Sequence, residues 1–111
     1  MFTKGFMVSL LLCPLMAFAD MTNSELTRYQ TTINCIDKGY FATVDRDAAG
    51  QARIDLINTA LEIAHLPAYS KTLAEQHIDK LDSNAYLSAR DACRQHMAEL
   101  NAAAERLGIA H

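Results

Sequence analysis

Apolar residues recur every three or four positions through most of the chain after residue 22, a period that predicts helices. A capping box of Thr22 and Glu25 starts the first helix, expected over 23–44. Gly108 suits the C′ position of the last helix, expected over 84–107. The first apolar stripe comprises Leu26, Tyr29, Ile33, Ile36, Tyr40 and Val44. The last comprises Tyr86, Ala89, Cys93, Met97, Leu100, Ala104 and Leu107.

Two further helices are expected between these, over 48–64 and 68–81. Asp45 or Asp47 can cap the first of them, and Pro67 suits the opening turn of the second. Strand signals are weak along the whole chain. The sequence therefore predicts an all-α, single-domain bundle of about four helices.

The first 19 residues have the pattern of a cleavable signal peptide. Lys4 supplies the positive charge, residues 6–16 form an apolar run, and Ala17-Phe18-Ala19 is an A-x-A cleavage site. The apolar run is shorter than the roughly 20 residues that span a bilayer. We therefore expect residues 1–19 to be removed on export, leaving a domain of residues 20–111.

Export determines how the cysteines are interpreted. Cys13 leaves with the signal peptide, so Cys35 and Cys93 remain and most simply form one disulfide in an oxidising compartment. This bond would link the first and last predicted helices across 58 positions. The chain-entropy model gives such a cross-link about 4 kcal/mol of stabilisation.

The charge balance excludes some partners. The full chain has a net charge of −3, and without Lys4 its 9 basic residues against 13 acidic ones give −4. An acidic surface argues against nucleic acid and, after signal cleavage, against anionic membranes. The same charge suits a basic protein partner but is also ordinary for a solvated domain, and both interpretations stay open.

The chain lacks the residue patterns of catalytic, metal or cofactor sites. It contains no H-E-x-x-H, no C-x-x-C and no glycine-rich phosphate loop, and the two cysteines are better explained as a disulfide than as a nucleophile. Glu75, His77 and Asp79 are close in sequence, but helical positions two apart point away from each other. We expect no enzyme activity, no metal and no cofactor.

Two places are candidates for partner binding. Leu66 and Tyr69 lie at the junction of the second and third predicted helices, and tyrosine is a common interface anchor. Asp82, Ser83 and Asn84 form a polar corner before the last helix. The alternative for the junction is that both side chains close the end of the core, and most such corners are only turns.

Three segments of the chain resemble one known family. They are Cys35-Ile36-Asp37-Lys38-Gly39-Tyr40, the later Asp47-Ala48-Ala49-Gly50-Gln51-Ala52, and Ala92-Cys93-Arg94-Gln95-His96 with the second cysteine. They are similar to the type VI secretion amidase immunity proteins, which show a C-I-x-x-[AG]-Y segment and a late second cysteine. Pro67 opening a helix also fits.

This resemblance implies a periplasmic, all-helical protein that binds a papain-like cysteine amidase. Family members fill the active-site cleft of that peptidoglycan-cleaving enzyme with a protrusion and so protect the producing cell. Many act as homodimers, so a second copy of this chain is a further expected partner. Two alternatives stay open: a small periplasmic stress chaperone, or another non-catalytic secreted helical binding protein.

Overall fold

The computed structural model describes residues 21–109, and the predicted signal peptide, 1–19, lies outside them. These residues form five helices and no strand: α2 (Asn23–Tyr40), α3 (Arg46–Ile63), α4 (Lys71–Glu75), α5 (Ser83–Gln95) and α6 (Met97–Arg106). The all-helical fold is confirmed. The described residues form five helices rather than about four, because the last predicted helix is divided in two.

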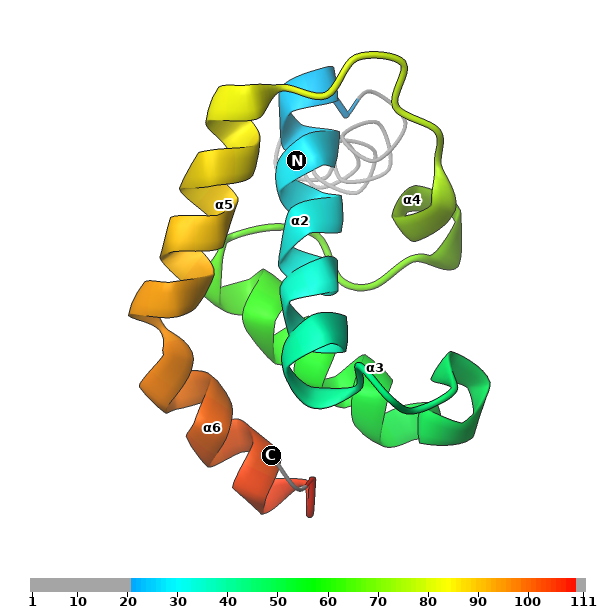
Figure 1. Ribbon diagram of the computed structural model, residues 1–111, viewed down its shortest axis with the longest axis vertical. Helices are drawn as coiled ribbons and strands as arrows, with labels where there is room; N and C mark the ends of the chain where they lie inside the picture. The colour runs from blue at the N-terminus through cyan, green and yellow to red at the C-terminus, as the bar shows by residue number, and fades with distance from the viewer. Residues whose placement is uncertain (1–20, 110–111) are drawn as a thin grey trace, which may run out of the picture.

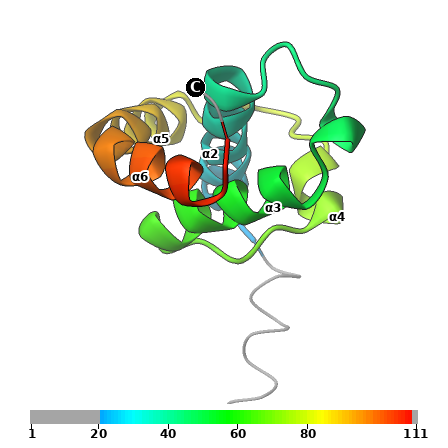
Figure 2. The same cartoon turned by 90° about the horizontal axis from the view of Figure 1, so that it is seen from below.

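Helix α2 lies at the centre of the molecule and contacts α3, α4 and α5. Figure 1 shows α5 beside α2 and running in the same direction, while α3 crosses behind α2. Helix α6 turns away from α5 and contacts α3, as the view in Figure 2 also shows. The chain thus closes around α2, with α4 and α5 on different sides of it.

One hydrophobic core joins all five helices. Its largest fully buried side chains come from α2, α3 and α6: Tyr29, Ile36, Leu56, Ile57, Leu61 and Leu100. Helix α5 contributes only small residues, Ala85, Ala89 and Cys93. These face a side of α2 on which Thr27, Thr31 and Thr32 are buried. Small residues on both helices allow their backbones to come close.

Three of the predicted helix-start and helix-stop signals are confirmed, whereas Pro67 does not open a helix, because α4 begins at Lys71 with Ser70 as its N-cap. Thr22 Oγ1 accepts a hydrogen bond from Glu25 N–H and Glu25 Oε1 accepts one from Thr22 N–H, each at 3.1 Å. Asp45 caps α3 by accepting from Asp47 N–H at 2.9 Å. Gly108 has a φ of +74° after α6, the left-handed conformation expected of a C′ glycine.

The predicted helix over 84–107 is interrupted at His96, which ends α5 and precedes α6. No proline or glycine causes this break. Helix α5 packs on α2, whereas α6 packs on α3 through Leu100, Ala103 and Ala104, so the chain must change direction between them. Tertiary packing here overrides a continuous helical propensity. The disulfide consequently joins the first described helix to the fourth, rather than to the last.

The helix expected over 68–81 is reduced to Lys71–Glu75. Ser70 is its N-cap, and its final carbonyls are bound by a side chain of α2 instead of by a further helical turn: Gln30 Nε2 donates to Leu73 O at 2.9 Å and to Gln76 O at 2.7 Å. The chain then runs without helical structure from 76 to 82. We call residues 76–82 the strap.

The first two predicted helices also differ from expectation at their junction. Helix α2 ends at Tyr40 rather than Val44, whose side chain is 43% exposed. Helix α3 begins two residues early but is kinked at Gly50, where φ is +59° and ψ is −139°. Residues with a Cβ atom rarely adopt a φ in this range, so the glycine at position 50 allows the backbone conformation of the kink.

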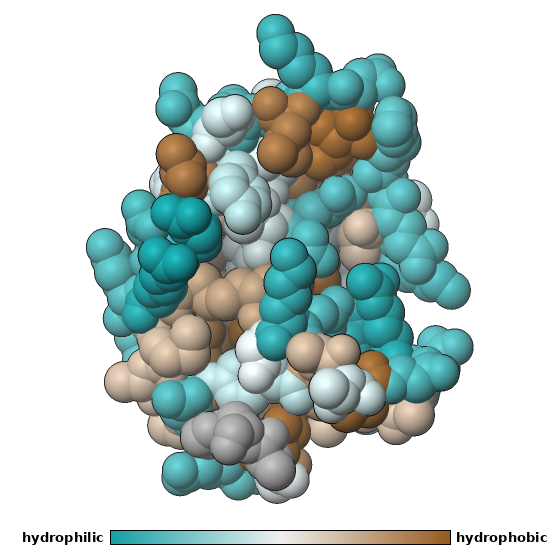
Figure 3. Space-filling model, in the orientation of Figure 1, coloured by the Kyte–Doolittle hydropathy of each residue, from teal (hydrophilic) through white to brown (hydrophobic). Residues whose placement is uncertain are grey.

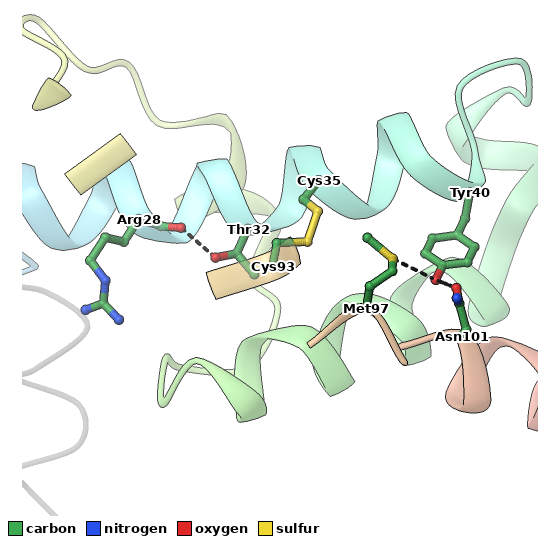
Figure 4. Close-up of a disulfide and its surroundings, with 7 residues drawn as sticks. All are labelled: Arg28, Thr32, Cys35, Tyr40, Cys93, Met97 and Asn101. Carbon is green, nitrogen blue, oxygen red and sulfur yellow. Dashed lines mark hydrogen bonds between the residues drawn. A yellow bond between two sulfur atoms is a disulfide. The ribbon is translucent and has the colours of Figure 1, made fainter. Parts of the chain in front are cut away.

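Cys35 and Cys93 form the predicted disulfide, with Cα atoms 6.8 Å apart. Figure 4 shows the bond between α2 and α5, and beyond it the Tyr40 side chain directed at Met97 and Asn101. The Tyr40 hydroxyl donates to Asn101 Oδ1 and lies 3.7 Å from Met97 Sδ. The covalent link and these contacts hold α2 against both α5 and α6.

Candidate functional site

The predicted corner, Asp82, Ser83 and Asn84, lies at the start of α5. Asp82 is the N-cap, its Oδ1 accepting from Ala85 N–H at 3.0 Å, and its own N–H lies 3.4 Å from Thr27 Oγ1. Ser83 and Asn84 are exposed in the first turn. The corner is therefore attached to α2, and the Asp82 carboxylate already has a structural role in starting α5.

The strap leading to this corner is fixed to α2 at both ends. Gln30 holds the carbonyls at its beginning, and near its end Asn23 Nδ2 donates to Lys80 O. In the middle, Ile78 is half-buried against the hydrophobic core. A segment without helical hydrogen bonds is thus held in one path by side chains of a single long helix.

The side chains of the strap point mostly into solvent. Leu81 is 55% exposed, more than any other large hydrophobic residue of the described chain. Figure 3 shows a hydrophobic area at this end of the molecule, over the start of α2 and the strap, bordered by hydrophilic side chains. Leu81 therefore offers apolar contact area on a fixed backbone at this end of the molecule.

His77 and Asp79 also project from the strap. Their side chains form an exposed pair, with Nε2 and Oδ1 3.2 Å apart. We expected them to point in different directions on a helix, and this expectation is wrong because the segment is not helical. The pair contains one acid and one imidazole, and no group of three potential metal ligands occurs within residues 21–109.

The predicted junction residues, Leu66 and Tyr69, are both half-buried and pack against the core. The backbone around them is bound from α2 and α3. The Tyr29 hydroxyl donates to Ala68 O at 2.9 Å and accepts from Ser70 N–H at 2.7 Å. Asn58 Oδ1 accepts from Tyr69 N–H at 2.7 Å. Burial also raises the pKa of the Tyr29 phenol above its ordinary value.

The structure does not bring the two predicted regions together. The corner is bonded to Thr27 and the junction to Tyr29, and side chains two positions apart on a helix point in nearly opposite directions. Figure 1 shows the start of α5 on one side of α2 and α4 on the other. A partner would therefore contact the junction and the corner as separate surfaces.

A buried ion pair next to the junction was not predicted. Arg53, 5% exposed, donates from Nε and Nη2 to the two carboxylate oxygens of Asp37 at 2.7 and 3.0 Å. The Arg53 guanidinium also lies over the Tyr69 ring, 5.7 Å from its centroid. The hydrogen bonds that Arg53 donates to Asp37 raise the pKa of the guanidinium further above its ordinary value.

Arg53 and Tyr69 also line an open hollow of about 660 Å³ between α2, α4 and the start of α3. Its rim carries both signs of charge, from Arg46 and Lys71 and from Asp47 and Glu75. Such a lining offers hydrogen bonds and ion pairs to a protein surface. It does not contain a nucleophile beside a base.

Comparisons with protein-family models, with curated proteins and with solved structures found no match for this chain. Among residues 21–109, no helix combines the length and the apolar character that crossing a membrane requires.

Proposed function

We propose that this protein is a periplasmic immunity protein that binds and occludes the active-site cleft of a papain-like peptidoglycan amidase. It protects the cell that produces both proteins and has no catalytic activity of its own. The resemblance around Cys35 to Tyr40 and at Cys93 suggests the family, and the predicted signal peptide suggests the compartment in which such a toxin acts.

The observation that carries the proposal is the strap. An inhibitor that enters a cleft binds more tightly when the entering segment is already ordered, because ordering a loop on binding costs affinity. Gln30 and Asn23 order the strap from α2, while His77, Asp79 and Leu81 remain exposed. The strap thus combines a fixed backbone with side chains that are free to contact a partner.

The chemistry of the strap also suits a Cys–His active site. Leu81 provides apolar area, and the neighbouring acids Asp79 and Asp82 can approach a protonated histidine. Filling the cleft excludes substrate without any reaction at the inhibitor. The disulfide between Cys35 and Cys93 contributes by making the helices that support the strap rigid.

Inhibition assays of the amidase with purified variants test whether the strap contacts the enzyme. Leu81→Asp should weaken inhibition by about tenfold or more, since it removes the exposed apolar side chain and adds a charge. Leu107→Asp is the matched control, because Leu107 is also exposed, at 36%, but follows α6. Equal inhibition by the two variants would exclude the strap from the interface.

A different substitution tests whether the negative charge of the corner contributes to inhibition. Asp82→Asn removes the charge but keeps an N-cap residue, as Asn and Asp are equally good caps. Asp82→Lys would weaken the cap as well, and its effect on binding would be mixed with a loss of stability. We expect Asp82→Asn to weaken inhibition by several-fold and Asp91→Asn, on the exposed face of α5, to leave it unchanged.

A further inference from the structure

A second hollow, on another part of the molecule, has an apolar floor. It encloses about 220 Å³ between α2, the end of α3 and the region where α5 meets α6. Ala60, Ile63, Ala89 and Leu100 contribute to its floor. An apolar cavity of about 150 Å³ accommodates a benzene molecule, so this groove has room for a slightly larger body.

The polar side chains around this groove are basic or neutral. Arg28, His65 and His96 line it together with the hydroxyls of Thr32 and Ser88, and no carboxylate is part of the lining. The lining thus differs in charge from the chain as a whole, whose net charge is −3. The Arg28 guanidinium would therefore give an anionic group a complementary charge here, although the protein as a whole repels anions.

Two of the three basic groups are available to a ligand. His96 is already bound through Nδ1 to Glu99 Oε1 at 2.8 Å. Within residues 21–109 the Arg28 guanidinium makes one hydrogen bond, from Nη2 to Ala64 O at 3.2 Å, and no salt bridge, which leaves most of its five N–H donors unused. Figure 4 shows Arg28 on the same side of α2 as Thr32 and Cys93, which also line the groove.

His65 reaches the rim in a conformation that glycine would favour. It follows α3 with a φ of +59°, and Leu66 N–H bonds back to Leu61 O at 2.8 Å, the pattern that commonly has glycine at this position. Glycine would suit the backbone at this position, so the fold does not require an imidazole here. Its imidazole has no hydrogen-bond partner among the described residues, which leaves it free to bind at the rim.

We propose that this groove binds a small carboxylate with an apolar ring or branched chain, its body on the alanine-rich floor and its carboxylate between Arg28 and His65. Arg28 would provide charge-assisted hydrogen bonds, and His65 would close the mouth beside it. The site is independent of the strap, so it adds a ligand to the proposed function without depending on it.

Titration of the disulfide-bonded protein with benzoate, followed by amide chemical shifts, tests this site. We expect saturable binding with a Kd of about 1 mM or tighter, and shifts concentrated at Ala60, Ala89 and Ala92. Benzamide has the same shape without the charge, and acetate has the charge without the ring. Both should bind at least about tenfold more weakly than benzoate.

Two variants of equal charge locate the carboxylate. Arg28→Gln should raise the Kd for benzoate by about tenfold, while Arg94→Gln, an exposed position of α5 outside the groove, should leave it unchanged. His65→Gly should weaken binding and keep the fold, since glycine suits the backbone there. Benzamide binding as tightly as benzoate, equal affinities of the two arginine variants, or the absence of saturation would overturn the proposal. If Arg28→Gln does not fold, His65→Gly and the comparison of ligands still decide whether the groove binds the carboxylate.

Discussion

Removing the carboxylate of Asp37 should destabilise the protein strongly, because it leaves the buried Arg53 charge without its partner. Arg53 is 5% exposed and makes both of its short hydrogen bonds to this one carboxylate. A lysine in this place could lose its proton, but a guanidinium cannot. The Asp37→Ala variant must therefore keep a cation where water has little access.

The structure also suggests a magnitude. Deleting one partner of a buried pair typically costs about 3 to 5 kcal/mol. We expect the lower end, about 3 kcal/mol, because the Asp37 side chain is 12% exposed and the Tyr69 ring remains beside the guanidinium. With a urea m-value of about 1 to 1.5 kcal/mol/M for a chain of this size, the midpoint should fall by about 2 to 3 M.

Urea unfolding followed by circular dichroism measures this effect, and Arg46→Gln is the control. Arg46 also faces Asp37, but at 3.8 Å and with a side chain that is 64% exposed, so its loss should cost at most about 0.5 kcal/mol. The double variant Asp37→Ala/Arg53→Met removes both charges and should recover about 1 to 2 kcal/mol relative to Asp37→Ala. A cost below about 1 kcal/mol for Asp37→Ala, or a double variant no more stable than it, would refute this reasoning.

Other stability predictions follow from the helices and their caps. Gly39→Ala should stabilise α2 by about 0.5 to 1 kcal/mol, since a Cβ there meets nothing within 4 Å. Gly50→Ala should destabilise the protein by about 1 kcal/mol or more, because its φ is +59°. Thermal unfolding of both variants checks that the two effects have opposite signs. Replacing Cys93 by Ala together with Cys35 should cost about 4 kcal/mol, measured against the oxidised protein by urea unfolding, and an unchanged midpoint would contradict it. Hydrogen bonds from Thr22 lower the pKa of Glu25 in the folded state. The stability that the Glu25 carboxylate contributes is therefore complete above its ordinary pKa of 4.5, and it is lost as the pH falls through the lower pKa of the folded state. Wild type should therefore exceed Glu25→Gln in stability at neutral pH and lose this advantage in acid.

Local signals in the sequence predicted local structure well. Thr22 and Glu25 form the expected capping box, Asp45 caps α3, and Gly108 ends α6, because each of these depends on residues within a few positions of one another. The pairing of Cys35 and Cys93 was predicted because only two cysteines remain after the proposed signal peptide.

Long-range contacts account for what could not be predicted. The break at His96 arises because α5 and α6 pack on different helices. At the end of α4, Gln30, more than forty positions earlier, binds the carbonyls of Leu73 and Gln76 in place of a further helical turn. Asp37 and Arg53 each lie next to apolar residues in their helices, a signal of burial for both, but neither helix alone indicates that they meet.

The residues of the candidate site also differ in how far the sequence indicates them. The corner at Asp82 was identifiable because its residues favour turns and caps. The exposed face of the strap, with Leu81 and Asp79, was assigned to a helix, so its projection into solvent became visible only in the fold.

Co-expression with an exported papain-like amidase encoded beside its gene tests the central claim most directly. Lysis of cells is measured with and without this protein, and complex formation is measured with the purified pair. The proposed function predicts that cells survive only when the protein is present, and that the two proteins form a stable, inactive complex. Equal lysis in both cases, with no complex in vitro, would contradict it, and suppression of protein aggregation in acid would then favour the chaperone alternative.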